Sequence, residues 1–392
     1  MAHIRNKFIL KSCKKVLSKK NGGTGCPALP SEQNQVAALP PNLMYEFQKG
    51  RAAQPVRPKF RKEAENMQEI KIGVVGLGWW GQILTGYFRE CKDVKIVALC
   101  DRRRNFPDSV LQDAKYYPEM QAMFDKKKMD GVVVVTPPEF HLPPVAMASE
   151  RGIHVYCEKP MAHRLEDCDR MIRVCKKNKV KLMIAFKHRF AKSFSCLKEK
   201  SRDLGKPLWS VYTYPLWKVD DPGWKFQTRG TPGIIVENFV HAIDGLIYLM
   251  GDVERVYAEG NRAVFKHPVL PDSVICTLRF KNGAIAAMGG GCTSDRRISR
   301  EYLDIHYEKG LAQIWGKLDY PFHLRFLRRE ESHPEEHCFE ESDGVREEIA
   351  YFLKCIRENR EPVISNGEEG RKSLATALAI LKSVRENRVV KV

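Results

Sequence analysis

The chain has 392 residues, of which 43% are hydrophobic and 29% are charged, and it carries a formal net charge of +18. This length favours two or three domains, and this composition excludes a wholly disordered, collagen-like or disulfide-scaffold chain. No apolar run approaches the ~20 residues that a membrane-spanning helix needs.

Half of the excess positive charge lies in the first 67 residues, which contain 13 Lys and Arg but only 4 Asp and Glu. Within this stretch, residues 21–62 are rich in Gly, Pro, Asn and Gln, a composition typical of a linker. We therefore predict a basic N-terminal extension, residues 1–67, that is solvated or packed on a neighbour rather than bound to nucleic acid. An organelle transit peptide is the alternative for this segment.

The 12 cysteines include no CxxC pair, and several lie in apolar or helical runs, where reduced cysteine behaves as a small hydrophobic residue. Cys168 and Cys175 have no histidine at metal-ligand spacing. The N-terminus also lacks the sustained apolar region of a secretory signal. These features predict a reduced, cytoplasmic protein that binds neither a structural metal nor a membrane.

A nucleotide-binding motif begins at residue 70. A β-branched run, residues 70–75, leads directly into Gly76-Leu77-Gly78-Trp79-Trp80-Gly81, and residues 82–89 are predicted as a helix. In this context Gly76 permits the tight turn, Gly78 lets the backbone approach a pyrophosphate, and Gly81 allows close packing of helix on strand. The order of strand, GxGxxG and helix therefore predicts dinucleotide binding.

A second strand, residues 94–100, ends at Asp101, which is 20 positions after Gly81. A carboxylate at this place is expected to bind the hydroxyl groups of the adenosine ribose. Arg102 and the two arginines after it complicate the choice of cofactor, because an arginine here can attract a ribose 2′-phosphate. The carboxylate favours NAD over NADP.

Helices and strands continue to alternate, with helices predicted at residues 117–124 and 144–150 and strands at residues 131–135 and 153–157. This alternation predicts a parallel, doubly wound sheet, whose ligands bind beyond the carboxyl ends of the strands. The candidates that lie at such ends are residues 76–81, Asp101, Thr136 and Lys159.

Several spaced motifs carry a resemblance to a known family. They are Thr136-Pro137-Pro138-Glu139-Phe140-His141 and the segments 152–160, 186–190, 230–244 and 368–374. From about residue 70 to its end the chain resembles the glucose–fructose oxidoreductase, inositol dehydrogenase and rhizopine catabolism family (Gfo/Idh/MocA). Only the N-terminal extension falls outside this resemblance.

The resemblance implies an α/β Rossmann domain, residues 68–190, followed by an α+β domain, residues 191–392, with a large, mostly antiparallel open sheet. The outer face of that sheet often makes oligomer contacts in the family, which implies a homo-oligomer, a dimer or a tetramer. The sequence agrees independently with the second domain, because five further runs read as strands without βαβ alternation: residues 208–214, 253–260, 274–280, 284–288 and 302–306.

Oxidation of a secondary alcohol requires a base for the hydroxyl proton, and histidine suits this step. Glu237 and His241 are spaced i, i+4, so on a helix they share one face. The matching pair in the family is usually Asp and His, which implies a catalytic role for His241. The glutamate leaves three roles open for Glu237: it can orient His241, bind a substrate hydroxyl or cap the helix. A purely structural role is the alternative for His241.

Lys159 matches the family's Glu-Lys-Pro lysine, which implies that its ammonium holds the substrate hydroxyl and lowers the pKa of that hydroxyl. Pro160 is predicted to begin the next helix. The resemblance also implies that Glu158 contacts the cofactor ribose, and that the lysine of Trp224-Lys225 lies near the nicotinamide. Trp224, like Trp217, can stack on a sugar ring, although either is alternatively a core residue.

The predicted cofactor-binding residues are Gly76, Gly78, Trp79, Trp80, Gly81, Asp101, Arg102, Thr136, Pro137, His141, Glu158, Lys159, Lys187 and Arg189. The predicted substrate-binding residues are Lys159, Trp224, Lys225, Glu237 and His241, of which Lys159, Glu237 and His241 are also predicted as catalytic.

The leading hypothesis is an NAD(P)-dependent oxidoreductase that acts on a secondary hydroxyl of a sugar, a sugar derivative or a cyclitol. One alternative is a redox-neutral enzyme that oxidises its substrate transiently, eliminates a neighbouring bond and then reduces the ketone again. A non-catalytic nucleotide sensor is the other alternative. The presence of both Lys159 and His241 argues against the sensor.

Overall fold

The structure, a computed structural model, describes residues 69–216, 233–262, 264, 270–292, 294–295, 297–318, 320–340 and 342–392. Residues Ala64–Val392 form one compact unit. The predicted N-terminal extension lies outside the described residues, as do Trp217, Trp224 and Lys225. None of the helices in the described ranges combines the length and the apolar character needed to cross a lipid bilayer.

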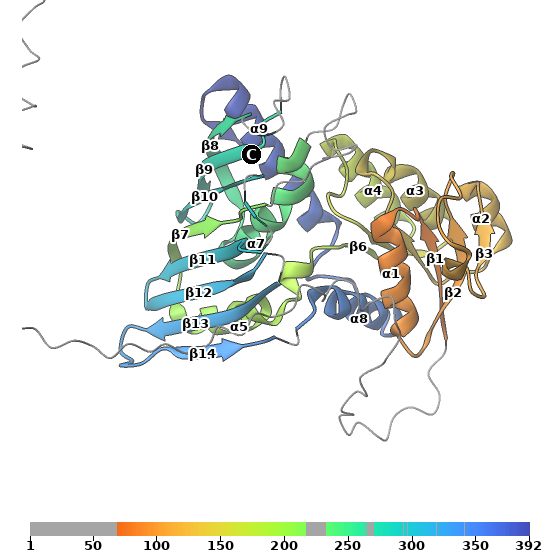
Figure 1. The fold of residues 1–392 in the computed structure, drawn as a ribbon, viewed down its shortest axis with the longest axis horizontal. Helices are drawn as coiled ribbons and strands as arrows, with labels where there is room; N and C mark the ends of the chain where they lie inside the picture. The colour runs from red at the N-terminus through yellow and green to blue at the C-terminus, as the bar shows by residue number, and fades with distance from the viewer. Residues whose placement is uncertain are drawn as a thin grey trace, which may run out of the picture. The chain divides into compact units, whose positions relative to one another are not determined.

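A six-stranded parallel sheet forms the first half of the described chain (Figure 1). Its spatial order, β3-β2-β1-β4-β5-β6, confirms the predicted doubly wound sheet. The strands are β1 (Ile70–Val75), β2 (Val94–Cys100), β3 (Lys115–Tyr117), β4 (Gly131–Val134), β5 (His154–Cys157) and β6 (Leu182–Ile184). All of β4 is buried, because a central parallel strand is covered on both faces.

The helices between these strands are α1 (Trp79–Glu90), α2 (Met120–Lys126), α3 (Leu142–Glu150) and α4 (Leu165–Lys177). Two of them correct the sequence-based expectation. The helix predicted from residue 117 begins at Met120, because the residues before it pair with β2 as β3. Pro160 does not begin a helix: it lies in the loop after β5, and α4 begins at Leu165.

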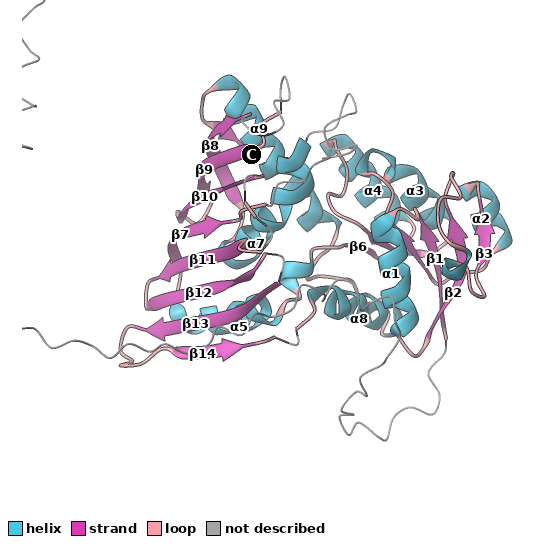
Figure 2. Ribbon diagram, in the orientation of Figure 1, coloured by secondary structure: helices cyan, strands magenta, loops and turns pink. Residues whose placement is uncertain are grey.

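A nine-stranded sheet dominates the second half (Figure 2). Its order is β14-β13-β12-β11-β7-β10-β9-β8-β15. Only the β7–β10 pair is parallel among these neighbours, so the predicted mostly antiparallel sheet is confirmed. The strands are β7 (Pro207–Thr213), β8 (Val253–Asn261), β9 (Ser273–Phe280), β10 (Ile285–Gly291), β11 (Arg300–Tyr307), β12 (Gly310–Lys317), β13 (Tyr320–Arg328), β14 (Glu335–Cys338) and β15 (Val390–Lys391).

Helices cover one face of this large sheet. Helix α5 (Lys192–Leu204) packs on β12 and β13, and α9 (Gly367–Glu386) packs on β8 and on α7 (Val240–Met250). Burial alternates along the strands, as expected for a sheet with one covered face. The other face leaves large apolar side chains exposed, including Trp209 and Ile275.

Helix α8 (Gly344–Arg357) returns from the second half of the chain to the nucleotide-binding sheet. Its apolar residues Ile349 and Phe352 share a buried cluster with Ile72 of β1 and Tyr156 of β5. The first sheet is therefore covered by a helix that lies far beyond residue 190 in sequence.

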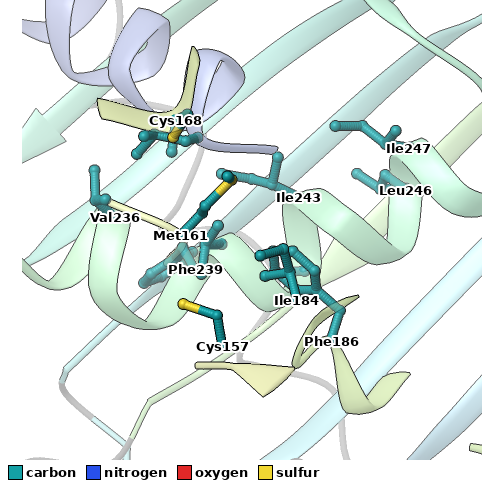
Figure 3. Packing of buried hydrophobic residues seen from close by; sticks show 14 of the residues in the cluster. Cys157, Met161, Cys168, Ile184, Phe186, Val236, Phe239, Ile243, Leu246 and Ile247 are labelled. Atoms are coloured by element: carbon teal, nitrogen blue, oxygen red, sulfur yellow. The ribbon is translucent and has the colours of Figure 1, made fainter. Parts of the chain in front are cut away.

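A second buried cluster joins the two halves of the molecule next to the candidate site. Met161, in the loop after β5, lies beside Ile243 of α7, and Phe239 lies nearby (Figure 3). Burial of an apolar side chain of this size stabilises a fold by about 1.5–3 kcal/mol. This packing fixes the loop that carries Lys159 against the helix that carries His241.

Candidate active site

The glycine loop between β1 and α1 is shaped by steric requirements. Gly76 has φ +101, in the left-handed region, and a Cβ there would lie 2.7 Å from the main chain of Val135. At Gly81 a Cβ would clash with the carbonyl oxygen of Gly76. Gly78, which caps α1, faces no atom within 4 Å. The open space at Gly78, next to the N-terminus of α1, fits a pyrophosphate and therefore the NAD that the sequence predicts.

Asp101 lies directly beside this loop. Its Oδ2 accepts a hydrogen bond of 2.6 Å from the main-chain nitrogen of Leu77, and its Oδ1 accepts one of 2.9 Å from that of Arg103. The carboxylate is half-buried, whereas Arg102 is exposed. Each carboxylate oxygen has a second lone pair, so the orientation of Asp101 is fixed while acceptor capacity for ribose hydroxyls is retained.

A tryptophan of the glycine motif binds the glutamate of the Glu-Lys-Pro motif. The indole Nε1 of Trp80 donates to Glu158 Oε1 at 2.6 Å, and the main-chain nitrogen of Lys159 donates to Glu158 Oε2 at 3.1 Å. Burial raises the pKa of Glu158, and the charge of Lys159 together with these hydrogen bonds opposes that rise. The neighbouring Trp79 is 77% exposed. The Trp80–Glu158 bond thus couples α1 to the loop that carries Lys159.

The histidine of the Thr-Pro-Pro segment is fully buried and holds two loops together. His141 Nε2 lies 2.7 Å from the carbonyl oxygen of Thr136, and Nδ1 lies 3.1 Å from that of Met161 and 3.4 Å from Cys157 Sγ. Burial lowers the pKa of His141 to about 4. The ring is therefore neutral, with a single N–H that donates to one of these two carbonyl oxygens.

Thr136 and Pro137 lie at the carboxyl end of β4, as predicted. Thr136 Oγ1 is buried without a hydrogen-bond partner among the described residues. A buried hydroxyl without a partner is costly unless a ligand or water satisfies it. Together with the open space at Gly78, this hydroxyl marks a polar ligand site along the edge of the sheet.

The three residues predicted as catalytic gather where the two halves of the molecule meet. Lys159 Nζ donates to the main-chain carbonyl oxygen of Glu237 at 2.8 Å. Glu237 lies in a π-turn, Ile235–Phe239, which runs directly into α7, and His241 lies in the first turn of α7. π-Turns within helices are frequent at functional sites. Glu237 and His241 are both buried, at 3% and 7% exposure.

The imidazole of His241 lies among other rings, with centroids 6.3 Å from Phe186 and 5.5 Å from His188. The carboxylate of Glu237 binds a different histidine, His163, whose Nε2 lies 2.7 Å from Oε1. Sequence reasoning missed His163. Its only signal was a histidine three residues after Pro160.

Arg189 is placed in the interior. Its guanidinium makes two hydrogen bonds of 2.8 Å to Asp244 and one of 3.0 Å to Glu369, and it donates to the carbonyl oxygen of Ile364 at 2.7 Å. Burial lowers the pKa of Arg189, but the charge and hydrogen bonds of Asp244 raise it by more, so the group stays protonated. This arrangement ties the segment after β6 to α7 and α9. Cofactor contact by Arg189 stays a prediction.

Lys187 lies two residues before Arg189, with Nζ 5.9 Å from the ring centroid of Tyr320. Its positive charge acts on Glu158 and favours the ionised form of that carboxylate. Within the described ranges, no group of three or more His, Cys, Asp or Glu side chains is arranged to hold a metal ion.

The sequence matches two family models. One is described as "Oxidoreductase family, NAD-binding Rossmann fold" and covers residues 70–186. The other is described as "Oxidoreductase family, C-terminal alpha/beta domain" and covers residues 200–392. Together they span both sheets and most of the candidate site, while Lys187 and Arg189 lie in the interval between the two models.

Among curated relatives, the chain is 28% identical to a myo-inositol 2-dehydrogenase of Thermotoga maritima, over 82% of this chain and 98% of the relative. It is 26% identical to a 2,7-anhydro-N-acetylneuraminate hydratase of Mediterraneibacter gnavus, over 63% of this chain and 68% of the relative. The fold is similar to that of a levoglucosan dehydrogenase in complex with NADH and levoglucosan, with a TM-score of 0.75 and 20% identity over 83% of this chain and 99% of the other.

Proposed function

Because the chain belongs to the Gfo/Idh/MocA oxidoreductase family through both its NAD-binding Rossmann fold and its C-terminal alpha/beta domain, we propose that it oxidises a secondary hydroxyl group of a sugar, a sugar derivative or a cyclitol with NAD. The observation that carries this proposal is the contact between Lys159 Nζ and the carbonyl oxygen of Glu237. It joins the loop that carries Lys159, at the carboxyl edge of the dinucleotide-binding sheet, to the segment that carries the buried Glu237 and His241.

NAD, when bound, supplies the nicotinamide ring that takes the hydride. An ammonium has three N–H donors, and Lys159 directs one of them to Glu237. A second N–H donates to the substrate hydroxyl oxygen, where the positive charge stabilises the alkoxide that forms as the proton leaves. His241 takes that proton, because imidazole is the side chain best suited to proton transfer near neutral pH.

The cofactor is held by the residues around the glycine loop. The N-terminus of α1 and the open space at Gly78 receive the pyrophosphate, Asp101 receives the adenosine ribose, and Thr136 Oγ1 offers a hydroxyl to the nicotinamide half. Trp80 acts through Glu158 and positions the lysine loop.

The experiment is a panel of sugars and cyclitols mixed with the purified protein and NAD, with NADH followed by absorbance and the released nucleotide identified by mass. Freely exchanging nucleotide and NADH accumulation with one compound would support an ordinary dehydrogenase. Products without NADH, together with tightly held NAD, would instead support the redox-neutral alternative, for which the name of the hydratase relative is weak support. Protein that binds no nucleotide under any condition would exclude both.

A homo-oligomer, a dimer or a tetramer, is part of this proposal. The uncovered face of the large sheet exposes several large apolar side chains: Trp209 and Val211 of β7, Ile275 of β9, Ile285 of β10 and Tyr302 of β11. Contiguous exposed apolar side chains are typical of protein–protein contacts. Light scattering tests this point, since Ile275→Glu should yield smaller assemblies than Lys95→Glu, a control on the other sheet.

We also propose a cytoplasmic location. Cys100, Cys157, Cys168 and Cys175 are free thiols, and burial raises the pKa of all four. Such thiols are characteristic of reducing compartments. Localisation of a tagged full-length chain tests this proposal against the transit-peptide alternative.

A further inference from the structure

We propose that His163 is a proton-relay residue, through which the proton released at the buried site moves from Glu237 to Glu139 and then to solvent. This inference rests on the proposed dehydrogenase function, since a reaction that releases a proton inside the protein needs a route outward. His163 is not expected to touch substrate or cofactor, and it acts through Glu237.

The three side chains form a line from the interior to the surface. The innermost is Glu237, whose side chain is 3% exposed and binds His163 Nε2 at 2.7 Å. His163, 7% exposed, presents its Nδ1 to Glu139 Oε2 at 3.7 Å. Glu139, in the turn Pro138–Phe140, has a side chain that is 33% exposed. Exposure therefore rises stepwise along the line.

The outer ring nitrogen of His163 is the feature that distinguishes a relay from a structural contact. His163 Nδ1 is buried and makes no hydrogen bond among the described residues. Its distance of 3.7 Å from Glu139 is too long for a hydrogen bond but suits a bridging water or a small rotation of the carboxylate. A histidine that served only to hold Glu237 would need only its Nε2.

Imidazole is chemically suited to this transfer. It can accept a proton at one nitrogen while it gives up the proton on the other, so no net charge has to cross the ring. In the oxidation, the substrate O–H bond breaks and its proton passes through His241 to Glu237. The hydride from the same carbon reduces NAD to NADH. Once Glu237 is protonated, its O–H donates to Nε2 of the Nδ1–H tautomer of His163. Nε2 takes that proton as Nδ1 loses its own to Glu139 or water, so one proton leaves per turnover.

The charged and titratable groups around this line come from two segments. Lys159, from the loop after β5, contacts the main chain of Glu237. His141, at the start of α3, lies close enough for the charges of Glu237 and His163 to act on it, in opposite directions. His141 is neutral near neutral pH because burial lowers its pKa to about 4.

The decisive variant is His163→Gln, because a glutamine side chain can still hydrogen-bond to Glu237 but cannot relay a proton. We expect kcat to fall about 100-fold, the lower end of the range for a lost proton-transfer step, with KM for NAD and substrate unchanged within about twofold. The solvent deuterium effect on kcat should rise, and the pH profile of kcat should change shape. Added imidazole should restore activity to His163→Ala in proportion to its concentration.

His333→Gln, at an exposed histidine of the second half, is the matched control and should leave kcat unchanged. NADH binding, followed by fluorescence, and the melting temperature should be the same in wild type and His163→Gln. If the wild-type enzyme is active and His163→Gln has the same kcat and the same isotope effect, the relay is overturned and the proposed function stays intact. A loss of NADH binding and thermal stability without imidazole rescue would also overturn it. Wild-type protein inactive toward every compound would remove the proposed function and the relay together.

Discussion

The ammonium of Lys159 lies 2.8 Å from the main-chain carbonyl oxygen of Glu237, a residue 78 positions further along the chain. This contact joins the loop after β5 to the π-turn before α7, and the buried side chains of Met161 and Ile243 pack beside it. The lysine is therefore held in place from both halves of the molecule before substrate arrives.

Lys159→Met should abolish most of the activity without loss of fold. The change removes the charge that stabilises the alkoxide, for which a fall in kcat of about 100- to 1,000-fold is expected. Steady-state kinetics measure the loss of activity, and NADH binding shows separately whether the fold of the cofactor site is kept. The control is Lys177→Met on α4. Unchanged kcat in Lys159→Met would remove the lysine from the mechanism.

Trp80→Phe should weaken the link between the glycine loop and the lysine loop. It deletes the 2.6 Å hydrogen bond to Glu158, and a lost bond to a buried charged acceptor costs about 1–3 kcal/mol. Urea unfolding measures this loss. The double variant Trp80→Phe with Glu158→Gln should lose less than the sum of the single losses, because both deletions remove the same bond. Additive losses would show that the bond is not formed.

Arg189→Met should destabilise the fold by about 3–5 kcal/mol, because Asp244 would remain buried without its partner. Arg189→Met with Asp244→Leu should recover much of that loss. The recovered double variant also tests the predicted cofactor contact: if Arg189 only ties α7 and α9 to the segment after β6, NADH binding returns with stability. A stable double variant that fails to bind NADH would instead assign Arg189 to the cofactor.

Stability should fall in mild acid because of His141. Burial lowers its pKa to about 4, below the value of about 6.5 in an unfolded chain. Between these two pH values the unfolded chain therefore binds a proton that the folded protein does not bind. A contribution of about 3 kcal/mol to the free energy of unfolding, fully present above pH ~6.5, is lost as the pH falls toward 4. Urea unfolding between pH 7 and pH 4.5 should show a steeper loss in wild type than in His141→Asn. Equal slopes would contradict the neutral assignment of the ring.

Asp101→Asn should shift the cofactor preference. The carboxylate is expected to bind the ribose hydroxyls, and its loss should raise KM for NAD about tenfold, which corresponds to about 1.4 kcal/mol. The exposed Arg102 should then allow NADP to compete, since the repulsion of a 2′-phosphate is removed. Kinetics with both cofactors measure the change. An unaltered ratio of kcat/KM for the two would place Asp101 outside the ribose site.

The nucleotide-binding sheet was predictable because its signals are local. The apolar run of residues 131–135 predicts its own strand, and the glycines from Gly76 to Gly81 predict their own turn. By contrast, β12, β13 and β14 were not recognised from the sequence, because alternating polar and apolar residues on a half-covered sheet give a weak signal. The return of α8 to the first sheet was also unpredictable, because the pairing of Tyr156 with Phe352 depends on long-range packing.

The candidate site was likewise predictable only in part. The sequence identified Lys159, Glu237 and His241 by resemblance and spacing, but it did not reveal the partner of Glu237. The Glu237–His163 bond joins residues 74 positions apart and depends on how the loop after β5 packs on α7. Likewise, the ion pair of Arg189 with Asp244 is set by three elements that meet only in the folded protein.

The most direct measurement follows the hydride itself. Wild-type protein is incubated with NAD and the best compound of the sugar and cyclitol panel, carrying deuterium at the carbon of the reacting hydroxyl, and the nucleotide product is weighed by mass spectrometry. We predict NADH that carries one deuterium, with the label transfer lost in Lys159→Met. Unlabelled nucleotide alongside an oxidised product would contradict the account.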